Sequence, residues 1–598
     1  MSLDVDERLT NSFTPQRVVD AYIQYKHSKW DHLSTSEMDS PRITIPMGAD
    51  GVTFEAFEKQ LYRHARNIAR RVQNGTYSFY PFREVEVEKE PAANGKSPKF
   101  RTLSIASIRD ALVQSILYQD VVYQPLEALF AKLDQPYPVS FAYRKGRSAP
   151  QASKNVYDFA QSGYWHVFDA DLSRYFDTIP HNDLMKRLYE VIGASGMRTC
   201  TLLKRFICVD RVPFDTYKSA KWNGRKVGYK IFQKRKPTRC KREAGVPQGG
   251  VLSGMLANLY LHSFDEWVVT KLSLRIDIKY VRYADDFVIL ARSPAVLSDI
   301  HSEVRKQIEL LGLSLNEDKT KHIDIRQEGL DFVGFSFDEE HMRIRERNVR
   351  KYQTRVIEDV IKPRAKKIDL IPDPKIALRS LAKHLRYKVH GVSDEEPCPK
   401  CGYTRVGEPR SWIAFFQAVT DNKQLHMLDK WTRKQAYAFM YDNYGIRISR
   451  KRLRRAGLRS LINEKYRLAR TRRKPCLCDI EEYGVWPFVS DIFQGRKLRT
   501  LALRRPFLIT KVTKRNIHLS VGTRKYLISK NAFGDLWTRL ETDKQLVRAN
   551  LERDGYKNTS HLFALLAELP GVQISYWPLR LSYSGPRPSA FLAFRYPD

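Results

Sequence analysis

The stretch KYVRYADDFVIL, residues 279–290, limits the fold of this chain more than any other feature. Two adjacent aspartates, Asp285 and Asp286, lie between two runs that are typical of β-strands. Neighbouring carboxylates repel each other, so such a pair is stable mainly when a divalent cation or a proton lies between them. The sequence therefore predicts two strands whose junction carries a metal site.

A second acidic strand is predicted upstream, in HVFDADLSRYFDTIPH, residues 166–181. Asp169 and Asp171 alternate there and are expected to point to the same face of the strand. Asp171, Asp285 and Asp286 are then placed to bracket two Mg²⁺ ions. Magnesium takes few protein carboxylates and completes its octahedron with water and substrate phosphates, so this set of residues predicts phosphoryl transfer.

The charge of the chain indicates a polyanionic partner. Its 598 residues include 103 Lys and Arg against 67 Asp and Glu, a formal net charge of +36. An anionic membrane surface would also attract such a chain, but no apolar stretch approaches the 18 residues of a membrane span. We expect a multidomain protein that binds nucleic acid and does not enter a membrane.

The start of the chain and its cysteines point to the cytoplasm. The first residues, MSLDVDERLT, are acidic and polar, and are expected to form neither a signal peptide nor an anchor. The seven cysteines are an odd number scattered over a long chain, which differs from a small disulfide scaffold. A reducing cytoplasmic location fits this usage.

The pattern along the chain predicts an α+β protein. Residues 1–80 are mostly helical in pattern, and a β-hairpin is expected from 80–90 and 100–107 around the turn-forming PAANGK. Alternating strands and helices continue to about residue 345. Residues 346–475 are helical and strongly basic, and 476–598 have the pattern of a separate α+β domain.

Several motifs in order carry a family resemblance. GVPQGGVLSGMLANLYL, LGLSLNEDKTKHI and GLDFVGFSF accompany FDADLSRYFDTIPH and RYADDFVILA, and together they resemble the palm motifs of group II intron-like bacterial reverse transcriptases. GADGVTFEAFE, PKFRTLSIASIRDALVQ and SFAYRKGRSAPQA resemble the fingers of that family. The resemblance spans about residues 45–345. It implies a right-hand polymerase with an N-terminal helical extension (1–80), fingers and palm (81–345), a helical thumb or maturase-like region (346–475) and an additional C-terminal α+β domain of unknown role (476–598).

The resemblance also assigns roles around the expected metal site. Asp171, Asp285 and Asp286 would be the ligands of two Mg²⁺ ions, with Asp169 in a supporting or structural place. Lys319, in NEDKT, would act either as a general acid toward pyrophosphate or as a counter-charge. A lysine suits both roles, and the sequence does not decide between them.

Further residues are assigned to the nucleotide and the nucleic acid. Lys99 and Arg101 would grip the triphosphate, because a guanidinium makes paired hydrogen bonds to phosphate oxygens. Phe176 would form a wall against the nucleotide 2′-position, although it, or Tyr175 beside it, could instead be a core aromatic. Gln248 is expected near the incoming nucleotide and the template. Arg144 and Arg147 are expected to hold the nucleic-acid backbone.

Two positions depart from the commonest family pattern, and two segments are unusually basic. Gly254 stands where the family usually has proline, and Ala142 where it often has glycine. Residues 221–245 form a basic insertion, and residues 445–474 include thirteen Lys or Arg and one acid. A density of one charge sign this high repels itself unless a partner neutralises it, so Arg452 and Arg455 are expected to contact nucleic acid.

Four cysteines suggest a second metal site. Cys398 and Cys401 have the spacing of a zinc knuckle, and Cys476 and Cys478 in PCLCD have a less usual spacing. One interpretation is a structural Zn²⁺ that joins the ends of the thumb. The alternative is four reduced surface thiols.

The sequence thus predicts an RNA-directed DNA polymerase whose partners are an RNA template, dNTPs and a DNA product. Three uses stay open. The first is anti-phage defence with a dedicated noncoding RNA, and the second is splicing and mobility of a group II intron. The third is a maturase that binds RNA without synthesis, which the complete aspartate set disfavours. The unassigned C-terminal domain favours the first, as does the lack of the His-Asn-His nuclease cluster that many mobile-intron proteins carry. Template identity, priming, protein partners and oligomeric state are not fixed by the sequence.

Overall fold

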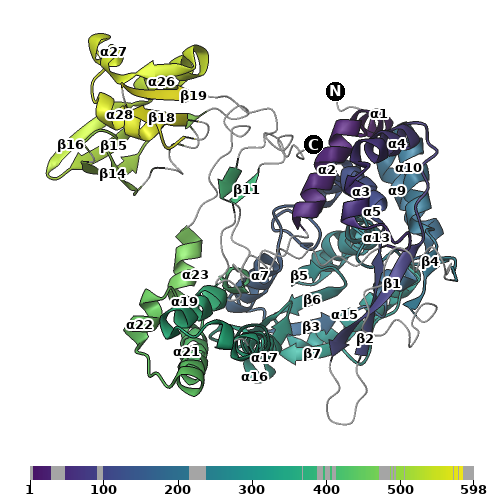
Figure 1. Cartoon of the computed structure of the whole chain (residues 1–598). Coiled ribbons are helices and arrows are strands. Elements are labelled where there is room, and N and C mark those ends of the chain that lie inside the picture. The colour runs from purple at the N-terminus through teal and green to yellow at the C-terminus, as the bar shows by residue number, and fades with distance from the viewer. Residues whose placement is uncertain are drawn as a thin grey trace. The chain divides into compact units, whose positions relative to one another are not determined.

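A computed structural model describes most of the chain in two compact units (Figure 1). One unit comprises residues 1–355 and 418–427, and the other comprises residues 356–417 and 428–598. In the described residues no helix combines the length and apolar character that a membrane crossing requires. The described residues are 4–28, 48–90, 99–214, 238–366, 368–386, 395–397, 404–406, 412–470, 485–486, 489, 493, 495–503, 505–569, 572–576 and 578–583.

The first unit begins with a helical layer, as the sequence predicts. Its helices include α1 (Val5–Ser12), α2 (Pro15–Ser28) and α4 (Leu61–Gln73). Helix α4 buries one stripe, which contains Ala65, Ile68 and Val72, and leaves its arginines toward the other side. This spacing at intervals of three and four residues places the apolar side chains on one face, where they join the core beside α5 (Ile108–Ile116).

The centre of this unit is a four-stranded antiparallel sheet in the order β5–β6–β3–β7 (Figure 1). Its strands are β3 (His166–Ala170), β5 (Ile278–Tyr283), β6 (Asp286–Ala291) and β7 (Lys321–Asp324). Helices α13 (Ser253–Trp267) and α15 (Leu297–Leu310) pack on the sheet through aromatic contacts with Phe287 and Phe168. Strand β6 is buried on both faces after its first residue, so it is continuously apolar from Phe287 to Ala291, and Asp286 lies at its start.

The predicted hairpin is confirmed. Strand β1 (Phe82–Glu90) pairs with β2 (Lys99–Ile105) in antiparallel register, with Val87 opposite Arg101. The short β4 (Arg211–Val212) adds to β1 in parallel. Alternation along β2 puts Arg101 and Leu103 on one face and Thr102 and Ser104 on the other.

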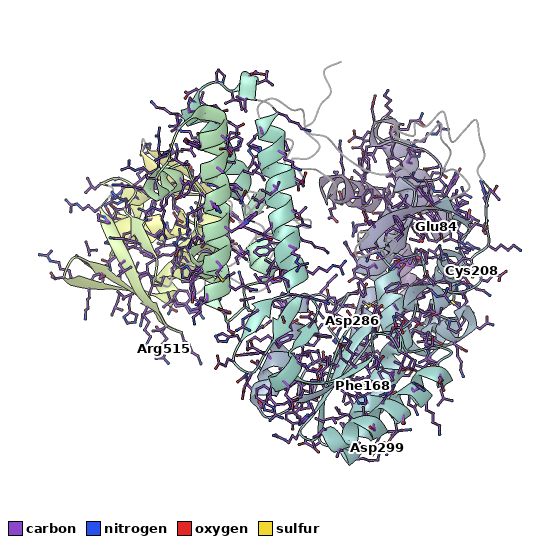
Figure 2. All side chains as sticks on the ribbon, turned by 90° about the horizontal axis from the view of Figure 1, so that it is seen from below. Glu84, Phe168, Cys208, Asp286, Asp299 and Arg515 are labelled. Atoms are coloured by element: carbon purple, nitrogen blue, oxygen red, sulfur yellow. The ribbon has the colours of Figure 1, made fainter. Side chains whose placement is uncertain are left out.

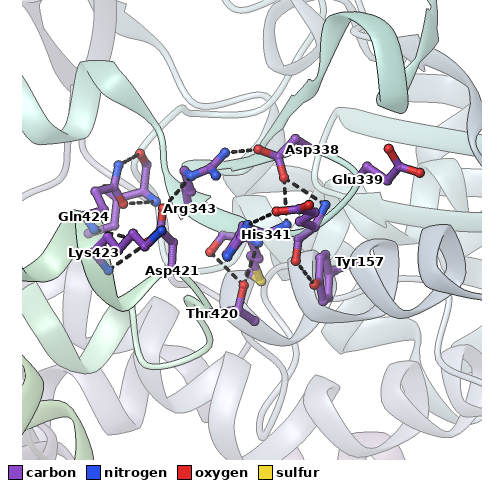
Figure 3. Close-up of polar contacts among 12 residues, drawn as sticks. Tyr157, Asp338, Glu339, His341, Arg343, Thr420, Asp421, Lys423 and Gln424 are labelled. Atoms are coloured by element: carbon purple, nitrogen blue, oxygen red, sulfur yellow. Dashed lines mark hydrogen bonds and ion pairs between the residues drawn. The ribbon is translucent and has the colours of Figure 1, made fainter.

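A small antiparallel sheet of β8 (Leu330–Phe332), β9 (Phe335–Phe337) and β10 (Met342–Ile344) completes the first unit. The segment 418–427 docks on β10 (Figure 3). Gln424 donates its side-chain amide to the Ile344 carbonyl at 2.8 Å and accepts the Ile344 N–H at 2.8 Å, which imitates a strand pairing. Arg343 also donates to Asp421 at 2.6 Å. Helix α21 (Asn422–Tyr444) therefore begins in the first unit, and it continues into the second.

The second unit contains basic helices and a β-rich region. The helices include α19 (Pro374–Leu385), α22 (Arg450–Arg455) and α23 (Leu461–Arg470). Between residues 485 and 583, two antiparallel sheets and helices α26 (Lys530–Asp543) and α28 (Thr559–Leu566) share one apolar core. A core of its own is what a separate domain requires. The predicted boundaries at residues 80, 345 and 475 stay predictions.

Candidate active site

The two aspartates of the opening motif lie in a tight turn at the end of the central sheet. Tyr283 pairs with Asp286 across β5 and β6, so only Ala284 and Asp285 make the connection. Ala284 has a left-handed backbone, with φ of 61°, which a residue with a Cβ adopts rarely. Strain of this kind persists only where the surrounding structure holds it, and it concentrates at functional sites.

A buried arginine holds the turn. Arg282 is 1% exposed, and its guanidinium donates to the Ala284 carbonyl at 2.9 Å and to the Asn258 side chain at 3.0 Å. It also makes a two-point ion pair with Asp265, at 2.7 and 2.5 Å. Asp265 in turn accepts a hydrogen bond from Tyr280 at 2.7 Å. The buried charge is thus paired and hydrogen-bonded, as burial of a charge requires.

Asp171 follows directly after β3 and reaches the same end of the sheet. The sequence placed it within a strand, but the strand ends at Ala170. The Asp171 carbonyl accepts from the Asn316 N–H at 2.8 Å, which fixes the backbone there. Its buried carboxylate forms an ion pair with Lys319. Burial alone lowers the pKa of Lys319, but the hydrogen bond and charge of Asp171, with the charges of Asp286 and Asp285, raise that pKa overall.

The carboxyl groups influence one another. Burial against the protein beneath it, together with the charges of Asp285 and Asp171, raises the pKa of Asp286 to about 8. The outer side of Asp286 is nevertheless exposed, so a cation arriving from solvent can reach it. Asp169 lies deeper. The pKa of Asp169 is raised to about 7, mainly by burial. The charge of Lys321 lowers this pKa in part, and the charge of Asp171 raises it.

These residues have the donor chemistry of a magnesium site without a preassembled arrangement. Three carboxylates whose charges repel one another gain most from a hard divalent cation, and oxygen ligands suit Mg²⁺. Within the described ranges, no three or more His, Cys, Asp or Glu side chains are already grouped as a metal ion needs. Lys319 neutralises Asp171 instead. The residues fit the ion, and its binding would replace part of this ion pair.

Aromatic rings stand beside the carboxylates. Phe176 is half-buried and meets the ring of Tyr143 edge-on, with centroids 6.2 Å apart. Tyr175 is buried and donates its hydroxyl to the Ala257 carbonyl at 2.5 Å, so it belongs to the core. Of the two neighbours that the sequence left open, Phe176 is the one near the site surface.

Tyr143 is a site residue that the sequence did not single out. Its side chain is 47% exposed and its φ is 60°. Burial, then the charge of Asp285, raises the pKa of Tyr143 to about 12, and Arg101 opposes the shift. A Cβ on Gly254 would come within 2.3 Å of two Tyr143 ring carbons. The glycine at the position where the family usually has proline therefore makes room for this ring.

The predicted nucleotide contacts lie around this pocket to different extents. Arg101 is exposed on β2, and it is close enough to Tyr143 for its positive charge to lower the pKa of that residue in part. Lys99 begins β2, but its side chain lies outside the described residues. The Gln248 carbonyl accepts from the Ser104 N–H at 2.7 Å, which ties the PQGG loop to the hairpin. Gly249, next in the loop, has a φ of 99°, a conformation that glycine adopts without strain.

The prediction for Arg144 is wrong. Its side chain is fully buried and forms ion pairs with Glu127 and Asp134, each at 2.7 Å. It also donates to the Ser140 carbonyl at 3.0 Å. A guanidinium with this set of partners cannot contact a nucleic-acid backbone, and it instead fixes the loop that presents Tyr143. Arg147 shares Asp134 at 3.0 Å but keeps part of its surface exposed.

Other predicted residues lie elsewhere or cannot be placed. Arg452 and Arg455 are exposed on α22, in the second unit. The basic insertion falls largely in residues 215–237, outside the described residues. The four cysteines of the predicted zinc site, Cys398, Cys401, Cys476 and Cys478, also lie outside them. The zinc interpretation stays a prediction.

An antiparallel sheet with carboxylates at one end, a β-hairpin that carries Arg101 and a tight two-residue turn between the central strands are the features of the palm and fingers of a right-hand nucleic-acid polymerase. Comparison with known families agrees. Residues 88–337 match the reverse transcriptase (RNA-dependent DNA polymerase) family. The chain therefore contains a reverse transcriptase domain, the domain of RNA-directed DNA polymerases, and it is similar to group II intron-encoded proteins, as the motifs predicted.

Several curated proteins are similar. Protein YkfC of Escherichia coli is 28% identical over 357 residues, which are 53% of this chain and 81% of YkfC. The group II intron-encoded protein LtrA of Lactococcus lactis is 26% identical over 293 residues, 49% of this chain and 40% of LtrA. A putative COX1/OXI3 intron 1 protein of Saccharomyces cerevisiae is 24% identical, with 48% and 36% of the two chains covered. The chain therefore spans less than half the length of these two intron proteins.

Solved structures with weaker similarity include a telomerase and a Cas6-RT-Cas1–Cas2 complex. Apo telomerase from Candida tropicalis, truncated from its C-terminal domain, has 16% identity and a TM-score of 0.31, covering 44% of this chain and 57% of that telomerase chain. A Cas6-RT-Cas1–Cas2 complex has 18% identity and a TM-score of 0.27, with 52% of this chain and 27% of the other covered.

Proposed function

We propose that the chain copies RNA into DNA by two-metal nucleotidyl transfer at Asp171, Asp285 and Asp286. The observation that carries the proposal is that these carboxylates lie at one end of the palm sheet, with Asp171 directly after β3 and Asp285 and Asp286 at the turn held by the buried Arg282. Clustered carboxylates with a raised pKa are costly unless they serve a function.

The chain's own groups would divide the work of binding and orientation. Arg101, with Lys99, would hold the triphosphate opposite the carboxylates. Phe176 would lie against the sugar and exclude a 2′-hydroxyl by its bulk. Lys319 would act as a counter-charge, because its ion pair with Asp171 keeps it protonated and in place. With these groups in place, the primer 3′-oxygen would attack the α-phosphate of the dNTP, and pyrophosphate would be the leaving group.

Mg²⁺ held by Asp171, Asp285 and Asp286 would lower the pKa of the primer 3′-hydroxyl and neutralise charge on the triphosphate.

Primer extension tests the activity. The purified chain, given a DNA primer annealed to RNA, dNTPs and Mg²⁺, should extend the primer to the end of the template. Chelation of the metal should stop extension, and added Mg²⁺ should restore it. A chain that binds the primed RNA but adds no nucleotide under any divalent cation would support the purely RNA-binding maturase instead.

For the biological use, we favour a dedicated noncoding RNA in anti-phage defence over splicing and mobility of a group II intron. The additional C-terminal domain, with its own core, supports a task beyond copying. The similarity to intron-encoded proteins supports the alternative. Both readings require selective recognition of folded RNA, because a +36 chain binds almost any RNA through phosphates.

Sequencing of co-purified nucleic acids separates the two uses. The chain is expressed with its native flanking DNA and washed at high salt, and the bound RNA and DNA are sequenced. We expect one abundant short RNA and DNA complementary to part of it. Enrichment of an intron would establish the mobility reading, and a random sample of cellular RNA would reject a dedicated template.

A further inference from the structure

The C-terminal domain contains a sheet with one sign of charge. Its strands are β13 (Lys497–Arg499), β14 (Pro506–Val512), β15 (Asn516–Val521) and β16 (Arg524–Ser529), in that order across the sheet. Residues 492–534, which include all four strands, have eleven Lys or Arg and no Asp or Glu. A surface with this composition repels itself unless an anion neutralises it.

The two faces of the sheet differ. One face carries buried apolar residues such as Phe507, Ile509 and Leu519, and it packs into the core with α26 and α28 (Figure 1). This is the ordinary alternation of a sheet covered on one side. Lys497, Lys511 and Lys525 therefore lie on the face that the helices leave to solvent.

The register defines rows of side chains across the exposed face. One row joins Lys497, Leu508, Ser520 and Lys525, and the next row joins Lys511, His518 and Leu527. We call these seven residues the C-terminal sheet face. An irregularity between Ile509 and Lys511 in the β14–β15 pairing leaves both Thr510 and Lys511 exposed.

The cations of the C-terminal sheet face are accessible. Lys497, Lys511 and Lys525 are exposed, and in the described part of the chain none has an acidic partner. Leu508 and Leu527, which belong to the same two rows, are 39% and 56% exposed. Arg515, in the turn after β14, adds a further cation beside this face (Figure 2).

The chemistry of this face fits RNA. Lys497 and Lys525 lie on the two edge strands, three strand spacings or about 14 Å apart, which is the length of about four stacked nucleotides. The lysines would contact phosphates, Leu508 and Leu527 offer apolar contact to bases, and the imidazole of His518 offers a planar surface to a base. Ser520 and Thr510 can hydrogen-bond a 2′-hydroxyl, the group that distinguishes RNA from DNA.

We propose that the C-terminal sheet face is a second RNA-binding site, which holds the backbone of the RNA that the palm copies. The site rests on the proposed function, because an enzyme that copies a long RNA has to retain template that is not yet in the palm. This site would give the C-terminal domain a role in the copying of a long RNA, a role that is not required when the template is short and already primed.

The test compares two double charge reversals in the full chain. Lys511→Glu with Lys525→Glu changes the sheet face, and Arg553→Glu with Lys557→Glu makes the same charge change at exposed positions on and after α27 (Arg548–Arg553). Affinity for a single-stranded RNA of about 40 nucleotides is measured over a range of KCl. Each lost phosphate contact on a single strand reduces the slope of log K against log salt by about 0.7.

We expect the sheet variant to lose about 1.4 of the slope and to bind RNA roughly tenfold more weakly at low salt, whereas the control keeps the wild-type slope. The milder Lys511→Gln with Lys525→Gln should lose slope in the same direction, and thermal unfolding checks that each variant is folded. Extension of a short, preannealed primer-template should stay within about twofold of wild type in all variants.

Equal slopes for wild type, sheet variant and control would overturn the proposal. If the wild-type chain extends no primer but the sheet variant still loses slope, the proposed polymerase function fails while the RNA-binding site stands. If extension is normal and the slope does not change, only the site fails.

Discussion

Replacement of Arg282 by methionine should destabilise the palm because it leaves a buried carboxylate without its partner. In the wild type, Arg282 donates four hydrogen bonds, two to Asp265, one to Asn258 and one to the Ala284 carbonyl. Both ion-pair side chains are 2% exposed. Removal of one partner from a buried pair costs about 3–5 kcal/mol, a large part of the 5–15 kcal/mol typical of a domain.

A double-mutant cycle separates the ion pair from simple loss of packing. Arg282→Met, Asp265→Leu and the double variant are compared by urea denaturation followed by tryptophan fluorescence. The double variant should be more stable than Arg282→Met alone, because no unpaired charge is left in the core. Strictly additive effects of the two changes, or an Arg282→Met midpoint equal to that of the wild type, would refute the reasoning.

Three further changes have defined outcomes. Gly254→Ala should raise the KM for dNTPs, because the new methyl group displaces the Tyr143 ring. The double variant with Tyr143→Ala should lack this clash. An unchanged KM in Gly254→Ala would show that Tyr143 does not line the nucleotide pocket. Phe176→Ala should raise ribonucleotide use relative to deoxyribonucleotide about 10- to 100-fold in competition assays, and an unchanged ratio would assign Phe176 to the core. Burial raises the pKa of Asp50 to about 6, so the folded chain binds a proton there that the unfolded chain has released. Stability should therefore fall by up to about 3 kcal/mol as pH rises from about 4 to above 6, and denaturation of Asp50→Asn should lack this part of the pH dependence.

Local patterns were sufficient for the core of the site. The β-hairpin of 82–105 and the strands that flank Asp285 follow from alternation and turn residues over a few positions. The three aspartates reach one end of the sheet because strand ends meet at a common edge. This arrangement follows from the topology once the motifs have been assigned in order.

Contacts between distant residues could not be predicted. Arg144 has the pattern of a nucleic-acid contact until the fold brings Glu127 and Asp134 to it, and the sequence does not indicate that pairing. Tyr143 contributes to the pocket because Gly254, 111 residues later, lacks a side chain. The only signal was that Gly254 departs from the family pattern.

The docking of segment 418–427 on β10 depends on side chains that imitate a strand. Gln424 pairs with the backbone of Ile344 although it lies on a helix. Periodicity reports the helix and gives no indication of this second set of partners. The start of α21 was therefore predicted as a helix, but its place in the first unit was not.

The central claim, that the coupled carboxylates perform polymerisation, is tested most directly by Asp285→Asn. Mg²⁺-dependent extension of a DNA primer on RNA and affinity for the same primed RNA are measured on the same preparation. Extension should fall at least 1,000-fold, about 4 kcal/mol in the transition state, while RNA affinity stays within about twofold. Normal Mg²⁺-dependent extension by Asp285→Asn would show that this carboxylate does not take part in polymerisation.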